Sequence, residues 1–80
     1  MARCEAAHVE DKRPCEGPPT AVRIVDRTDA EATGCLLHGA ALLASIEGGR
    51  VYPLDGSAIE VYQRAQTMRP FDFARAVAGA

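Results

Sequence analysis

Three cysteines and two histidines are the residues of this sequence that are best suited to bind a metal ion. They are Cys4, His8, Cys15, Cys35 and His38, and all of them lie in the first half of the 80-residue chain. Thiolate sulfur and imidazole nitrogen are preferred ligands of zinc in proteins, and structural zinc sites combine four of them. The clustering of these side chains therefore predicts one structural metal site.

The spacing of Cys35 and His38 favours a shared role as ligands. They form a C-x-x-H motif at the start of a predicted helix, where side chains three positions apart lie on the same face. Both would reach one metal ion from the first helical turn. The sequence identifies no third group that orients His38 as a base and no oxyanion donor, so we do not expect the protein to be an enzyme.

Cys15 and one earlier residue are expected to complete the site. Cys15 is followed by Glu16 and Gly17, and a small residue just after a cysteine lets the backbone turn tightly around a metal. Cys4 and His8 both qualify as the fourth ligand, with ten and six residues between them and Cys15. Cys4 is favoured, because three thiolates and one imidazole form a common closed zinc site, and His8 is the alternative to Cys4.

Other interpretations of the cysteines remain open at this point. All three can be buried apolar side chains with no metal between them. A structural disulfide is disfavoured, because the count is odd and the cytoplasm is reducing. A redox-responsive zinc switch is a further alternative, in which Cys4 lies near the exposed terminus and its oxidation releases the metal.

A loop, a hairpin and a helix are expected to position the ligands. Residues 1–19 are polar and contain three prolines, which predicts a loop. Residues 21–27 are rich in β-branched side chains and predict a strand, and residues 31–33 predict a short return strand after a turn. Residues 35–46 are rich in Leu and Ala at helical spacing and precede a Gly-Gly pair, which predicts a helix in which Gly39 is a local cost.

The C-terminal half predicts a second helix. Residues 50–54 form a short extended segment, which Pro53 confines to a sheet edge or a connector. Ser57 and Glu60 have the spacing of a capping box and begin the helix, and Pro70 ends it near the preceding residue. An apolar stripe at helical spacing runs along it: Ala58, Val61, Tyr62, Ala65 and Met68.

The aromatic side chains are expected to contribute to the core. These residues are Tyr52, Tyr62, Phe71 and Phe73. The predicted fold is therefore a small α+β domain over residues 1–73, with an N-terminal metal-binding loop, a short β-hairpin and two α-helices. Residues 74–80 are expected to form a flexible tail.

This order of elements resembles the treble-clef group of zinc fingers. The segment from Cys4 to Glu47 combines a cysteine loop, a hairpin and a C-x-x-H helix. It is also similar to small actinobacterial zinc-finger-like proteins of unknown function that share this arrangement. The resemblance implies one structural zinc ion bound by Cys15, Cys35 and His38, with Cys4 or His8 as the fourth ligand.

Composition excludes several classes of protein. Hydrophobic residues make up 48% and charged residues 25% of the chain, which is typical of a soluble globular domain rather than a disordered or membrane protein. No stretch is long and apolar enough for a membrane span, and Met1 to His8 lack the apolar region of a secretion signal. We therefore expect a cytoplasmic protein with no membrane partner.

The charge pattern bears on the choice of partner. Nine basic and eleven acidic residues give a net charge of −2, which argues against a broad phosphate-binding surface. Basic residues near the hairpin and loop nevertheless keep nucleic acid as an alternative partner: Arg3, Lys12, Arg13, Arg23 and Arg27. The sequence thus predicts a small zinc-binding interaction module for another protein, with a zinc-finger regulator that binds nucleic acid as the alternative.

Overall fold

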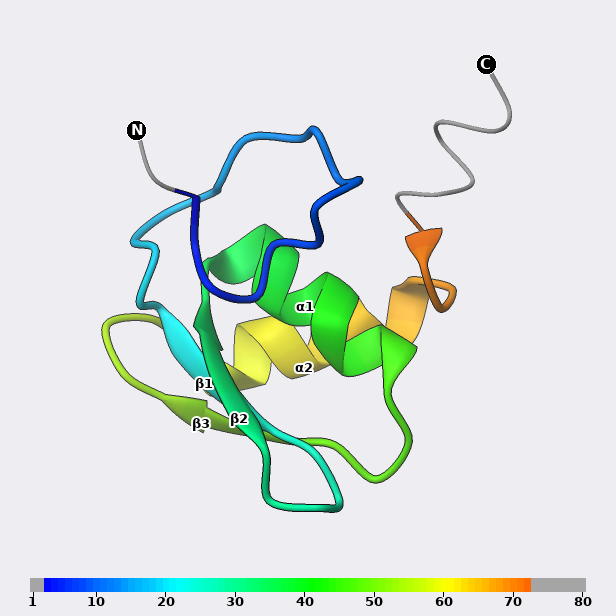
Figure 1. Cartoon of the computed structure of the whole chain (residues 1–80). Coiled ribbons are helices and arrows are strands. Elements are labelled where there is room, and N and C mark those ends of the chain that lie inside the picture. The colour runs from blue at the N-terminus through cyan, green and yellow to red at the C-terminus, as the bar shows by residue number, and fades with distance from the viewer. Residues whose placement is uncertain (1–2, 73–80) are drawn as a thin grey trace.

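A three-stranded sheet and two helices make up the protein. The computed structural model describes residues 3–72. In chain order the elements are β1 (Val22–Val25), β2 (Glu31–Gly34), α1 (Leu36–Ser45), β3 (Arg50–Pro53) and α2 (Ala58–Thr67) (Figure 1). The predicted α+β fold is confirmed. No helix within residues 3–72 has the length and apolar character needed to cross a membrane.

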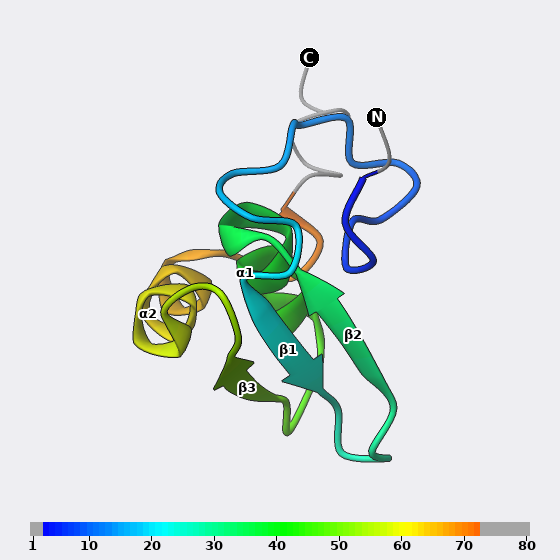
Figure 2. The same ribbon diagram turned by 90° about the vertical axis from the view of Figure 1, so that its left-hand side faces the viewer.

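Strand β1 lies at the centre of an antiparallel sheet with the order β2-β1-β3. Val22 is opposite Gly34 of β2 and opposite Pro53 of β3. The predicted hairpin is confirmed as β1 and β2, and Pro53 closes an edge strand as expected. Figure 2 shows β3 at the side of the sheet nearest α2.

Both helices begin at capping residues that the sequence contains. The backbone N–H of His38 donates to Cys35 Sγ at 3.2 Å at the start of α1. Glu60 N donates to Ser57 Oγ at 3.1 Å at the start of α2, which confirms this half of the predicted capping box. Helix α1 packs against β1, β2 and α2, so the C-x-x-H motif lies at the junction of sheet and helix layers.

The main core is built from aliphatic and small side chains. Its buried members are Ala21, Val22, Ile24, Ala40, Val61 and Ala65. Two glycines allow the layers to approach closely: a Cβ atom on Gly39 would lie 2.9 Å from Cγ2 of Val22, and one on Gly34 would lie 3.1 Å from the Cα of Gly39. Close packing therefore requires glycine at position 39, although glycine destabilises the helix locally.

The prediction that the aromatic rings contribute to the core was wrong for the described residues. Tyr52 is 37% exposed, and Tyr62 and Phe71 are each 52% exposed. Aliphatic and small side chains fill the core instead, and the ring of Tyr52 lies under the guanidinium of Arg23, which is 4.8 Å from the ring centroid. Phe73 and the predicted tail at 74–80 lie outside the described residues.

Candidate metal centre

Four predicted ligands come together at the start of α1. Cys4 and Cys15 lie in the N-terminal loop, Cys35 is the N-cap of α1, and His38 lies in its first turn. Their candidate ligand atoms all lie within 4.8 Å of one another, so the four side chains can hold one metal ion. Segments that are more than 30 positions apart thus converge on one point, as 34 positions separate Cys4 from His38.

The separations between ligand atoms fit a tetrahedral ion. His38 Nδ1 lies 3.5 Å from Cys4 Sγ, 3.5 Å from Cys15 Sγ and 3.2 Å from Cys35 Sγ. With zinc–sulfur bonds of about 2.3 Å and a zinc–nitrogen bond of about 2.0 Å, tetrahedral geometry places sulfur about 3.5 Å from nitrogen. The donor set and its dimensions therefore suit a four-coordinate zinc ion.

The centre is closed rather than open to a substrate. Cys35 is 0% exposed, His38 1% and Cys4 7%, while Cys15 is half-buried. A catalytic zinc needs a coordination position that water or substrate can reach. Four protein ligands in a buried cluster leave no such position, which favours a structural role for a bound metal.

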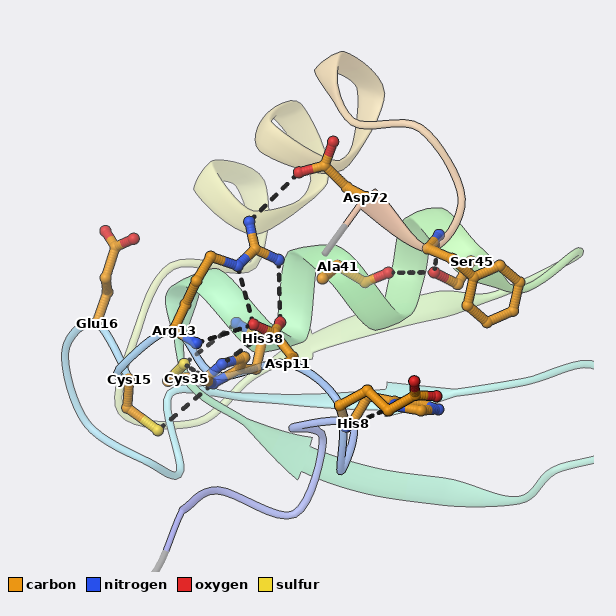
Figure 3. A network of polar contacts seen from close by, with 12 residues as sticks. His8, Asp11, Arg13, Cys15, Glu16, Cys35, His38, Ala41, Ser45 and Asp72 are labelled. Atoms are coloured by element: carbon orange, nitrogen blue, oxygen red, sulfur yellow. Dashed lines mark hydrogen bonds and ion pairs between the residues drawn. The ribbon is translucent and has the colours of Figure 1, made fainter. Parts of the chain in front are cut away.

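His8 does not belong to the cluster. Its side chain is exposed, and its Nδ1 accepts a hydrogen bond from the backbone N–H of Glu10 at 3.0 Å (Figure 3). Cys4, the favoured candidate for the fourth ligand, lies with the other three residues instead.

Backbone hydrogen bonds hold the loop against the hairpin and helix. Ala6 N donates to Thr33 O at 2.9 Å, and Thr33 N donates to Glu5 Oε1 at 2.8 Å, so the segment after Cys4 runs along β2. Leu36 N donates to Glu16 O at 2.9 Å, which fixes the segment after Cys15 to the start of α1. Both loop cysteines are therefore adjacent to anchored backbone.

The two fully enclosed thiols differ in their affinity for protons. Burial and the proximity of Cys35 raise the pKa of Cys4 to about 11, although a hydrogen bond from the backbone of Cys35 opposes the shift. Burial also acts to raise the pKa of Cys35, but hydrogen bonds from the backbone N–H groups of His38 and Glu16 outweigh it and lower that pKa. A metal must therefore displace a proton from Cys4.

His38 is prepared to act as a neutral ligand. Burial lowers the pKa of His38, and this effect is larger than the opposing effect of the Asp11 carboxylate, which raises the pKa. Nδ1 faces the three sulfurs, whereas Nε2 lies 3.6 Å from Oδ2 of Asp11. The imidazole is thus placed between the thiols and a carboxylate.

Asp11 is the residue of this centre that sequence reasoning missed. It is 1% exposed, and its Oδ2 accepts from Arg13 Nη2 at 2.9 Å. In the sequence Asp11 is one of several acidic residues interleaved with basic ones, which is typical of a solvated surface. Its position between His8 and Cys15, inside the predicted ligand loop, is the one signal that could have identified it.

The chain matches no protein-family model, no curated protein and no solved structure among those compared. The assignment of the centre therefore rests on the geometry and chemistry of its own residues, and the resemblance to small zinc-finger-like proteins stays a prediction.

Proposed function

We propose that this protein is a small zinc-binding interaction module in which one structural Zn²⁺ fastens the N-terminal loop to helix α1. The observation that carries this proposal is the closed cluster of Cys4, Cys15, Cys35 and His38, whose sulfur–nitrogen separations match a tetrahedral zinc site. The order of loop, hairpin and ligand-bearing helix supports the resemblance to treble-clef fingers.

A small domain gains stability from such a site. A chain of this size has an expected stability of about 4 to 12 kcal/mol, and a structural zinc contributes about 10 to 16 kcal/mol in finger peptides. The hydrophobic cluster between the loop and α1 has only three buried members, Cys4, Cys35 and Leu37. We therefore propose that zinc is the main interaction that holds residues 3–20 against the rest of the domain.

Cobalt substitution tests the ligand set. Protein reduced and loaded with Co²⁺ should show the intense visible bands of a tetrahedral thiolate complex, and addition of Zn²⁺ should abolish them in a 1:1 ratio. The weak spectrum of an octahedral Co²⁺ complex, or no spectrum at all, would contradict a Cys3His centre.

The surface proposed for a protein partner lies on α2 and on the residue that follows β3. Ile59 and Tyr62 are one helical turn apart and are 71% and 52% exposed, and Leu54 is 50% exposed. Exposed aliphatic and aromatic side chains contribute much of the binding energy at protein interfaces. An Ile59→Lys, Tyr62→Ser variant should keep its zinc and lose a partner that wild-type protein retains; unchanged retention would place the interface elsewhere.

Nucleic acid is less well supported as a partner. Carboxylates lie beside most of the guanidinium groups among residues 3–72, in the pairs Arg13–Asp11, Arg23–Glu31, Arg27–Glu47, Arg50–Asp29 and Arg64–Glu16. Paired guanidiniums offer little net positive charge to phosphate. Binding of nucleic acid that weakens steeply as the salt concentration rises would support this alternative.

A redox-responsive zinc site is the second candidate function, and the exposure of Cys15 favours it. Cys15 is the half-buried thiol of the cluster, whereas Cys4, which lies near the N-terminus in the sequence, is only 7% exposed and is not the accessible thiol. A peroxide would therefore reach the sulfur of Cys15 first. Zinc that stays bound, with all thiols reduced, after peroxide treatment would exclude this candidate.

A further inference from the structure

The two ring nitrogens of His38 face different chemical surroundings. Nδ1 lies 3.2 Å from Cys35 Sγ and faces the cluster, whereas Nε2 points to the loop segment from Asp11 to Arg13 (Figure 3). When a metal occupies Nδ1 of a neutral imidazole, the proton must be on Nε2. The groups that surround Nε2 therefore decide how well His38 is held in the orientation of a ligand.

Asp11 and Arg13 form one compact unit beside Nε2. Asp11 Oδ1 accepts from the backbone N–H of Arg13 at 3.1 Å and from its Nε at 3.0 Å, and Oδ2 accepts from Nη2 at 2.9 Å. The same Oδ2 lies 3.6 Å from His38 Nε2, and the main-chain carbonyl of Arg13 also acts as a hydrogen-bond acceptor for the ring. Both acceptors near Nε2 therefore depend on this unit.

Arg3 completes the surroundings of the ring. Its guanidinium lies 3.3 Å from Nε2 and donates to the carbonyl oxygens of His8, Asp11 and Arg13. A guanidinium has donors only, so its contact with Nε2 is a hydrogen bond only while Nε2 is unprotonated. With the proton on Nε2, Arg3 keeps its bonds to the carbonyl oxygens, and among these neighbours only the Asp11–Arg13 unit can receive that proton.

Charges of both signs surround the centre. Zinc with three thiolates and a neutral imidazole would carry one net negative charge, and the carboxylate of Asp11 adds a second. The guanidiniums of Arg3 and Arg13 lie beside them, and Arg13 also pairs with Asp72 at 3.3 Å. The two cations therefore compensate part of the negative charge of an occupied centre.

We propose that Asp11 is a positioning residue of the metal centre, which together with Arg13 fixes His38 so that Nδ1 binds the metal and Nε2 carries the proton. This inference rests on the proposed structural zinc. At 3.6 Å the Asp11 carboxylate attracts the ring without a hydrogen bond, and it holds Arg13, whose main-chain carbonyl receives the ring proton. Groups that orient a ligating histidine in this way typically change metal affinity by about 10- to 100-fold when they are lost.

Two variants separate this role from a general effect of lost charge. Asp11→Asn keeps the shape of the side chain but removes its charge. Glu16→Gln is the matched control, since Glu16 is also a loop carboxylate paired with an arginine, Arg64, at 3.2 Å. Zinc affinity measured by chelator competition should fall by about 10- to 100-fold in the first variant and stay within about twofold in the second.

Nitrogen NMR of protein labelled with ¹⁵N-histidine gives a second readout, which identifies the coordinating nitrogen in the wild type and compares proton exchange between the variants. His38 should bind the metal through Nδ1 and show a protonated Nε2 whose hydrogen exchanges slowly, and Asp11→Asn should accelerate that exchange while Glu16→Gln does not. Coordination through Nε2, or equal affinities and exchange rates in the two variants, would overturn the role of Asp11. A wild-type protein that binds no metal would instead refute the proposed function itself.

Discussion

Gly34 and Gly39 approach each other so closely that a Cβ atom on Gly34 would lie 3.1 Å from the Cα of Gly39. Gly34 ends β2, and Gly39 is in α1, so this contact fixes where the helix starts relative to the hairpin. Cys35 and His38 lie between these two glycines in the chain. The contact of strand and helix backbones is thus a structural basis for the position of two ligands.

Substitution of Gly39 by alanine should destabilise the protein, even though alanine is favoured over glycine in helices by about 1 kcal/mol. The added Cβ would lie 2.9 Å from Cγ2 of Val22, which is buried in the core. Such overpacking typically costs about 1 to 3 kcal/mol. Urea denaturation of the zinc-loaded protein measures the effect, with Gln66→Ala on the exposed face of α2 as a nearly neutral control. A Gly39→Ala variant as stable as wild type would contradict the close packing.

Removal of the metal should make the loop open more often than α2, with the closed loop still the main state. Hydrogen exchange at the amides of Ala6 and Leu36 should accelerate after chelation, because their bonds to Thr33 O and Glu16 O join the loop to the fold. The amide of Val61, which donates to Ser57 O at 3.2 Å, should keep more of its protection. Equal loss of protection at all three positions would show that the metal stabilises the whole domain as one unit.

The stability of the metal-free protein should rise as the pH increases up to about 6.5. Burial lowers the pKa of His38 in the folded state, so the unfolded imidazole, with its ordinary value of 6.5, binds more protons near that pH. Stability therefore increases between the lowered pKa of the folded state and 6.5, and it levels off once the unfolded imidazole has also lost its proton. Denaturation over a pH series tests this, and His38→Asn should flatten the slope. A slope unchanged by His38→Asn would assign the effect to another group.

The cap of α2 should affect stability without affecting the metal. Ser57→Ala removes the acceptor of the Glu60 N–H, which typically costs about 1 kcal/mol. Zinc affinity should be unchanged, because α2 provides none of the four clustered side chains. Comparison of the denaturation midpoint with chelator competition measures both quantities in one variant. A matching fall in zinc affinity would mean that α2 and the metal centre are coupled.

Local sequence signals predicted where the helices begin better than they predicted which side chains are buried. The Cys35–His38 spacing and the Ser57–Glu60 spacing each mark a helix start, because capping depends on a few neighbouring residues. The exposure of Tyr62 was not predictable from its place on the apolar stripe. On the same stripe Val61 and Ala65 are buried, so helical spacing identified the buried face of α2 but not which of its side chains the neighbouring elements cover.

Cys4 and Asp11 show a second limit of sequence-based prediction, which is the path of the N-terminal loop. Sequence spacing left Cys4 and His8 as alternatives, since the path of an irregular loop depends on contacts such as Ala6 N with Thr33 O. The burial of Asp11 depends on the same path, because the loop has to fold over His38 before the carboxylate is enclosed. Neither follows from periodicity or capping.

Native mass spectrometry with elemental analysis tests the central claim most directly. Freshly reduced wild-type protein should carry one zinc ion per chain. Separate alanine substitutions of Cys4, Cys15, Cys35 and His38 should each abolish or strongly reduce occupancy, whereas His8→Ala should retain it. A wild-type chain that holds no metal, or one whose zinc is lost with His8 and kept without Cys4, would contradict the proposed centre.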